Sequence, residues 1–90
     1  MCTIVKEIVV QRETGLHIRP ANELVQAIEK LDCTVFLEHG KERANAKSIM
    51  GLLTLTALRG AKLKLVATGP DAEEAVRCVE AVLTDGRTPD

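Results

Sequence analysis

The segment from Ile18 to Leu31 constrains the fold more than any other part of the chain, because apolar residues recur in it every three or four positions. They are Ala21, Leu24, Val25, Ile28 and Leu31. Such spacing predicts an amphipathic helix that buries one face and exposes the other. Pro20 falls in the first turn, where its missing N–H removes no intrahelical hydrogen bond, so we expect the helix to begin just after His17.

Four other segments have the pattern of strands. Alternating or β-branched apolar residues predict them, and turn-forming residues separate them. The predicted strands are Thr3 to Val10, Cys33 to Glu38, a short run that ends near Asn45, and Lys62 to Ala67. The turn-prone sequence His39-Gly40-Lys41 joins the second and third strands into a predicted hairpin.

Two further helices are predicted from the residues at their beginnings. Ser48 is a good N-cap residue before a brief helical pattern, which Gly51 weakens. Asp71 with Glu74 resembles a capping box at the start of a last helix, and Gly86 can cap its end. The order strand, helix, strand, strand, helix, strand, helix predicts an α+β open-faced sandwich, in which every helix can cover one face of a single mixed or antiparallel sheet.

The size and composition of the chain fit one domain and exclude several classes of function. Ninety residues with 46% hydrophobic content suffice for one core, so we expect a single domain spanning residues 1–90. Phe36 is the only aromatic residue, which argues against nucleic-acid or sugar binding by ring stacking. A net charge of −1 gives no electrostatic reason to bind nucleic acid or an anionic membrane. We therefore expect the partners to be proteins.

The cysteines and the N-terminal segment favour a cytoplasmic location. Cys2, Cys33 and Cys78 are odd in number and far apart, so we predict neither a disulfide framework nor a metal site, and we expect no cofactor. Lys6 and Glu7 interrupt the apolar run near the N-terminus, and no stretch approaches the roughly 18 apolar residues of a membrane span. We expect no membrane insertion.

His17 is the residue of greatest chemical interest, because it lies where a loop meets the predicted start of the best helix. Backbone N–H groups and the positive end of the helix dipole favour an anion there, and Arg19 can add charged donors. The same field keeps the imidazole neutral and nucleophilic, as a phosphoryl acceptor requires. A lone histidine in a loop is more often a surface or capping residue. Here, however, two further features of a phosphoryl site lie within four residues of the chain: Arg19 supplies charged donors, and Pro20 fixes the start of the helix.

Two segments resemble the motifs of a known family. They are Gly15-Leu16-His17-Ile18-Arg19-Pro20-Ala21 and Asn45-Ala46-Lys47-Ser48-Ile49-Met50-Gly51. The first resembles the active-site motif, and the second resembles the regulatory-serine segment, of the HPr phosphocarriers of the bacterial phosphotransferase system. The resemblance implies a four-stranded antiparallel sheet covered on one face by three helices, in the order βαββαβα. It also implies a monomeric phosphoryl carrier rather than a stand-alone enzyme.

The resemblance assigns roles to individual residues. His17 is the phosphoryl acceptor through Nδ1, Arg19 contacts the phosphate and the partner, and Ser48 is the target of an ATP-dependent HPr kinase/phosphorylase. The donor is Enzyme I, charged from phosphoenolpyruvate, and the acceptors are IIA domains of sugar permeases; a transcriptional regulator is a further implied partner. The implied partner-binding residues are Leu16, Ile18, Pro20, Lys47, Ile49, Met50 and Leu53.

Several alternatives stay open at the level of sequence. Ile18 replaces the small alanine usual after the histidine, which bears on packing and partner preference, and Ser48 is also explained as a simple helix cap. The carrier can belong to a nitrogen-linked or purely regulatory branch instead of sugar uptake. A binding module that is never phosphorylated and a small hydrolase such as an acylphosphatase are the alternatives from other classes.

Overall fold

The fold is that of a computed structural model, which describes residues 2–11, 16, 18–55 and 57–85. The elements follow the predicted order, and a π-helical turn, η1, directly continues the last helix. They are β1 (Thr3–Val9), α1 (Ile18–Ile28), β2 (Thr34–His39), β3 (Glu42–Asn45), α2 (Ile49–Leu53), β4 (Lys62–Thr68), α3 (Ala72–Glu80) and η1 (Ala81–Asp85).

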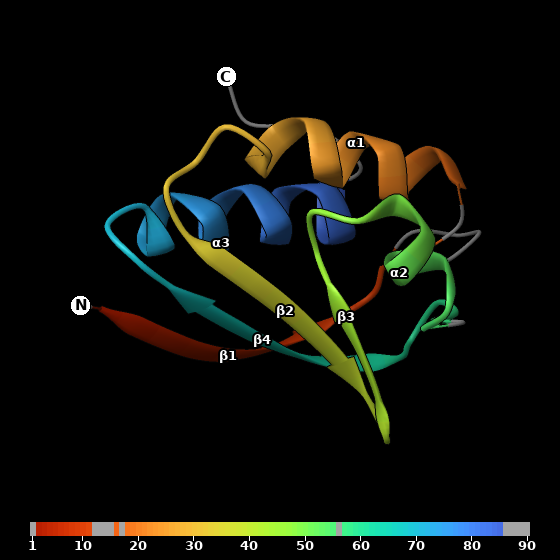
Figure 1. Cartoon of the computed structure of the whole chain (residues 1–90). Helices are drawn as coiled ribbons and strands as arrows, with labels where there is room; N and C mark the ends of the chain where they lie inside the picture. The colour runs from red at the N-terminus through yellow and green to blue at the C-terminus, as the bar shows by residue number, and fades with distance from the viewer. Residues whose placement is uncertain (1, 12–15, 17, 56, 86–90) are drawn as a thin grey trace.

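The four strands form one sheet in the order β1-β4-β2-β3, and every neighbouring pair is antiparallel. Helices α1 and α3 lie side by side across one face of this sheet, and α2 lies beside α1 (Figure 1). The prediction of an antiparallel open-faced sandwich is therefore confirmed, and the alternative of a mixed sheet is wrong. None of the described helices is long and apolar enough to cross a membrane.

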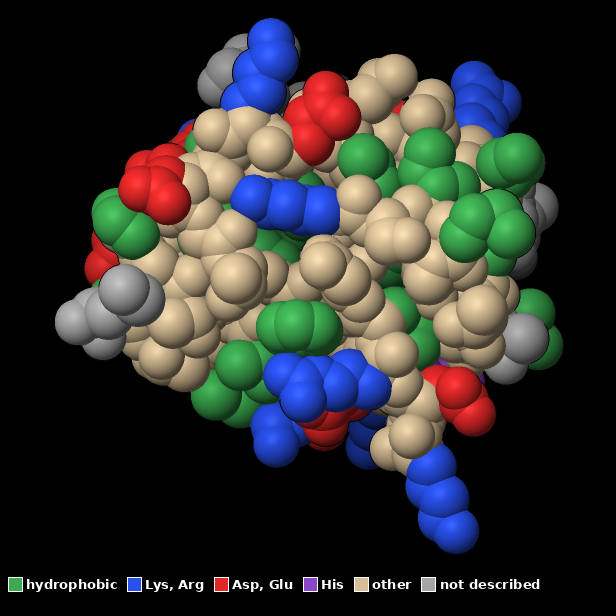
Figure 2. Space-filling view, in the orientation of Figure 1, with side chains coloured by type: hydrophobic (Ala, Val, Ile, Leu, Met, Phe, Trp, Pro, Cys, Tyr) green, Lys and Arg blue, Asp and Glu red, His purple; other side chains and the backbone are tan. Residues whose placement is uncertain are grey.

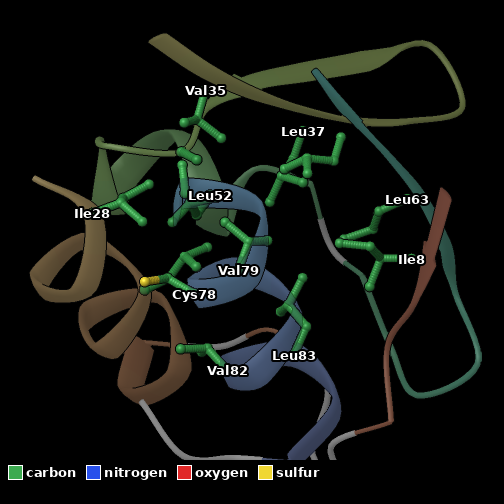
Figure 3. Packing of buried hydrophobic residues seen from close by; sticks show 14 of the residues in the cluster. Ile8, Ile28, Val35, Leu37, Leu52, Leu63, Cys78, Val79, Val82 and Leu83 are labelled. Carbon is green, nitrogen blue, oxygen red and sulfur yellow. The ribbon is translucent and has the colours of Figure 1, made fainter. Parts of the chain in front are cut away.

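The core lies between the sheet and the helices, and the predicted apolar patterns supply it. Most inward side chains of the strands are fully or almost fully buried, as are most of the apolar residues of α1 and α3, and Figure 3 shows them interdigitating. The strand contribution is Ile8, Val35, Leu37, Ala44, Leu63, Leu65 and Ala67. Leu31 is only partly buried, because α1 ends at Ile28 and a tight turn follows, in which the Leu31 N–H donates to the Ile28 carbonyl.

The predicted capping box at Asp71 does not form. Asp71 occupies the N-cap position of α3, but its Oδ2 accepts a hydrogen bond from the Asp32 N–H at 2.7 Å instead of from the helix. The Asp71 N–H in turn donates to the Asp32 carbonyl at 3.1 Å. Glu74 pairs with Arg77 one turn later. The carboxylate thus joins α3 to the turn before β2, while Gly86, the predicted C-cap, lies outside the described residues.

Candidate functional site

The two segments that carry the resemblance lie together at one end of the molecule. The Leu16 N–H, just before α1, donates to the Ala57 carbonyl, just after α2, at 2.8 Å. Helix α1 also packs against α2, and Figure 1 shows α2 beside the N-terminal half of α1. His17 itself, like Gly15, is not among the described residues, so the geometry of the site rests on its neighbours.

The beginning of α1 presents one apolar and one cationic side chain to solvent. Ile18 is 65% exposed, and the Arg19 side chain is 81% exposed. The Arg19 Nε lies 3.9 Å from Glu23 Oε1 on the next turn, a contact worth little in water. Because 81% of the side chain is exposed, an incoming anion can reach the guanidinium from solvent. Pro20 lies in the first turn, as its lack of an N–H predicted, and its ring is buried.

Ser48 caps α2, as predicted. Its backbone is extended, at φ −117° and ψ 115°, and its Oγ accepts a hydrogen bond from the Gly51 N–H at 3.1 Å. The Leu52 N–H donates to the Ser48 carbonyl at 3.0 Å, which closes the first turn. A Cβ on Gly51 would lie 3.4 Å from the Ser48 Cβ and Oγ, an ordinary van der Waals contact. The hydroxyl proton is not used in this capping bond.

Lys47 is bound within the chain. Its Nζ donates to the Leu31 carbonyl at 2.7 Å, just beyond the C-terminal end of α1, where a cation complements the helix dipole. Its N–H donates to Asn45 Oδ1 at 2.9 Å. A partner that needed the Lys47 charge would first have to break this bond.

The exposed apolar residues near the site form a smaller set than the sequence predicted. Met50 is 74% exposed, whereas Ile49 and Leu53 are partly buried against the core. Leu16 is only 6% exposed and belongs to the core, as does Pro20, so these two side chains are removed from the predicted partner surface. Figure 2 shows apolar side chains gathered over this part of the molecule. We call Ile18, Ile49, Met50 and Leu53 the apolar patch.

Two residues near the site were missed by the sequence analysis. Leu58, one residue beyond Ala57, is 72% exposed. The His39 Nδ1 lies 2.8 Å from the Leu55 carbonyl, and because a carbonyl only accepts, Nδ1 is the donor. His39 thus fixes the segment after α2, which in turn holds Leu16. The isolated leucine between Ala57 and Arg59 could have indicated exposure, but a hairpin histidine carries no such signal.

The described thiols and carboxylates do not form a competing reactive centre. Burial raises the pKa of the Cys78 thiol, and Glu74 raises it further. Burial also raises the pKa of the Cys33 thiol, against the lowering effect of Lys47. Neither thiol is activated as a nucleophile. No group of three or more potential metal ligands occurs among the residues that the structure describes.

Comparisons with known proteins agree on one family. Residues 4–85 match the family model described as the PTS HPr component phosphorylation site. The chain is 40% identical over 77 residues to the phosphocarrier protein HPr of Treponema pallidum, covering 86% of this chain and 88% of that one. The crystal structure of an HPr from Bacillus anthracis superposes with a TM-score of 0.86 at 32% identity, covering 92% of this chain and 99% of the other. HPr-C-His from Thermoanaerobacter tengcongensis superposes with a TM-score of 0.82 at 34% identity, covering 99% and 100%.

Proposed function

This chain belongs to the HPr family, the phosphocarriers of the phosphotransferase system, and we propose that it accepts a phosphoryl group on His17 from phospho-Enzyme I and passes it to IIA domains of sugar permeases. The observation that carries the proposal is the Leu16 to Ala57 hydrogen bond, which holds the loop before α1 against the segment that follows α2. It places the neighbours of His17 beside the apolar patch. As a phosphocarrier, the chain is a covalent intermediate rather than a stand-alone catalyst.

The chemistry asks little of the chain beyond a nucleophile and a positive environment. In the first transfer, the His17 Nδ1–phosphorus bond forms as the bond between phosphorus and phospho-Enzyme I breaks. In the second transfer, the Nδ1–phosphorus bond breaks as phosphorus bonds to the acceptor IIA domain. The N-terminal end of α1 carries a partial positive charge that stabilises the phosphoryl oxygens and disfavours imidazolium. Arg19, exposed in the first turn, supplies charged donors.

We assign partner docking to the apolar patch. Ile18 and Met50 are exposed, and Ile49 and Leu53 support them from partly buried positions. An exposed, unbranched methionine suits a surface that must meet several different partners in turn. Because Lys47 bonds to the end of α1, it stabilises this region rather than steering the partner.

Ser48 is the proposed regulatory site, a target of HPr kinase/phosphorylase. A phosphoserine carries about −1.5 to −2 charges, which the N-terminus of α2 accepts without loss of fold. Met50 lies two residues further on, so the new charge enters the docking surface instead of the core. Phosphorylation is therefore expected to weaken docking to Enzyme I.

Arg19→Glu tests the proposal with a matched control. The substitution replaces a cation beside the phosphoryl group with a repelling anion, so transfer from phospho-Enzyme I should slow strongly. Lys41→Glu makes the same charge change at the exposed β2–β3 turn, far from α1 in Figure 1, and should transfer at the rate of the unchanged chain. Equal rates for the two variants would reduce Arg19 to an ordinary surface residue.

The second candidate function is phosphoryl transfer within a nitrogen-linked or regulatory branch. Sugar uptake is favoured because Ser48 is present in the segment that resembles the regulatory serine motif. Transfer from the phosphorylated chain to isolated IIA domains of either branch separates the two. We further propose that residues 1–90 form one domain and act in the cytoplasm, where these partners would meet it.

A further inference from the structure

The sheet face opposite the described helices carries its side chains in ordered rows, which the strand registers define. We call this surface the open face. Reading across the strands, one row is Thr3, Thr68 and Thr34; the next is Val5, Val66, Phe36 and Asn45; and the third is Glu7, Lys64, Glu38 and Arg43. Beyond the third row, β1 and β4 alone continue with Val9 and Lys62. Where three or four strands contribute, the open face thus has a hydroxyl row, a largely apolar row and a fully charged row.

The apolar row is accessible to a partner. Val5 is 58% exposed, while Val66 and Phe36 are half-buried by their neighbours in the sheet. The Arg43 guanidinium lies 4.0 Å from the centroid of the Phe36 ring, and its Nε lies 3.8 Å from Glu38 Oε2. Arg43 therefore links the apolar row to the charged row. A contiguous apolar strip of this kind, bordered by charges, is typical of an interaction surface.

The charged row identifies the occupant. From β1 to β3 its signs are negative, positive, negative, positive. A two-fold axis parallel to the strands, passing between β4 and β2, reverses the order of the strands in a facing copy. Glu7 then faces the partner's Arg43, and Lys64 faces the partner's Glu38. Because every position meets the opposite charge, the row is complementary to itself.

The same axis also matches the other rows. It brings Val66 against the partner's Phe36 and Thr68 against the partner's Thr34, while Val5 lies at the edge over the partner's Asn45. A two-fold axis in the interface but perpendicular to the strands would instead set the charged row against the hydroxyl row. We therefore propose that the open face binds a second copy of this chain, face to face, about a two-fold axis parallel to the strands.

The size of the face sets the strength of the association. The strands have 7, 6, 4 and 7 residues. At about 4.8 Å between strands and about 3.3 Å per residue, they cover roughly 400 Å² per copy. The total of roughly 800 Å² lies below the roughly 1,200 Å² of a stable interface, so the dimer is weak and forms only at high protein concentration. In dilute solution the chain is then a monomer, as the family resemblance implies. Because the paired charges are at the surface, added salt weakens the dimer.

The interface leaves the proposed phosphoryl site accessible. The apolar patch belongs to α1 and α2, which lie on the other side of the sheet (Figure 1). Each copy in the dimer therefore retains its own docking surface. The proposal is independent of the proposed function, since self-association and phosphoryl transfer are measured separately.

Complementary charge reversals test the proposal by sedimentation velocity at low salt. Lys64→Glu sets two negative charges against each other twice in the dimer, and Glu38→Lys does the same with positive charges, so each variant alone should remain monomeric. An equimolar mixture of the two variants restores opposite charges at all four positions and should associate as the unchanged chain does. Lys6→Glu is the control, because Lys6 pairs with Glu80 of α3 on the helix side of the sheet, and it should associate normally.

A second pair of variants allows the same test if a variant of the first pair does not fold. Glu7→Lys and Arg43→Glu lie on the edge strands, and they too should dimerise only when mixed. All variants are first required to unfold cooperatively. An unchanged chain that stays monomeric up to about 1 mM, which corresponds to binding weaker than about −4 kcal/mol, would overturn the proposal. Mixtures that fail to associate would also overturn the proposal. So would single variants that dimerise as strongly as the unchanged chain, a result that dimerisation by exchange of strands would explain.

Discussion

Gly69 joins β4 to α3 in a conformation that only glycine adopts easily. Its φ is +133°, and a Cβ built on it would lie 2.8 Å from the Asp32 carbonyl oxygen and 2.8 Å from the Cα of Cys33. Both neighbours are backbone atoms, so neither can rotate away as a side chain would. The same turn carries the Asp71 to Asp32 hydrogen bonds. Gly69→Ala should therefore displace a connection that holds two elements together.

The expected cost combines two contributions. The strained φ costs about 1 to 3 kcal/mol, and disturbing the bonds to Asp32 costs about 1 to 2 kcal/mol more. Gly60→Ala is the matched control, because Gly60 has φ +91° but no atom within 4 Å of the place a Cβ would occupy, so it should lose only the conformational part. At about 4 to 8 °C per kcal/mol, the second contribution should lower the Tm of Gly69→Ala by about 10 °C more than that of Gly60→Ala.

Thermal and urea unfolding, followed by circular dichroism, measure both variants under the same conditions. The expected result is a much larger loss of unfolding free energy in Gly69→Ala than in Gly60→Ala. Equal losses would show that the close approach to Asp32 and Cys33 contributes nothing, and that φ alone decides the cost.

Three further predictions concern the segments around the site. His39→Leu removes the donor to the Leu55 carbonyl and should slow phosphoryl transfer. His39→Asn keeps a donor near the Nδ1 position and should restore most of the rate. Equal transfer rates for the two variants would exclude a positioning role for His39. Ser48→Ala should lose about 1 kcal/mol of stability through the lost cap, whereas Ser48→Asp keeps an acceptor and should instead raise the apparent KM of Enzyme I for this chain. Because the pKa of the Cys78 thiol is raised in the folded state, the thiol loses its proton at lower pH in the unfolded state. The free energy of unfolding should therefore decrease above about pH 8.5. In urea unfolding measured at several pH values, Cys78→Ala should show a smaller decrease.

The predicted elements and their order could be obtained from hydrophobic periodicity together with capping and turn-forming residues. Val35 and Leu37 are buried while Phe36 between them is not, as alternation requires. The stripe of α1 was predicted residue by residue as far as Ile28, because burial of a helix face repeats every three or four positions. The turn at His39-Gly40-Lys41 predicted one antiparallel pair, but antiparallel pairing of the whole sheet followed only from the family resemblance, since alternation along one strand does not identify its neighbour.

The residues that the sequence misplaced all make contacts with distant segments. Asp71 has the local sequence of a cap, yet its carboxylate bonds to Asp32, and a local pattern cannot distinguish these two uses of one acceptor. Lys47 reaches the end of α1, and Leu16 enters the core through a loop whose path depends on Ala57. The chemistry of the candidate site stays a prediction from the sequence, whereas the share of each side chain available to a partner could be obtained only from the fold.

The central claim, that His17 carries the phosphoryl group, is tested most directly by mass measurement after incubation with phosphoenolpyruvate and Enzyme I. The chain has only two histidines, His17 and His39, so His39→Gln is the natural control for His17→Ala. We predict a single acid-labile phosphoryl adduct on the unchanged chain and on His39→Gln, and none on His17→Ala. An acid-labile adduct on His17→Ala, or its loss from His39→Gln alone, would contradict the claim.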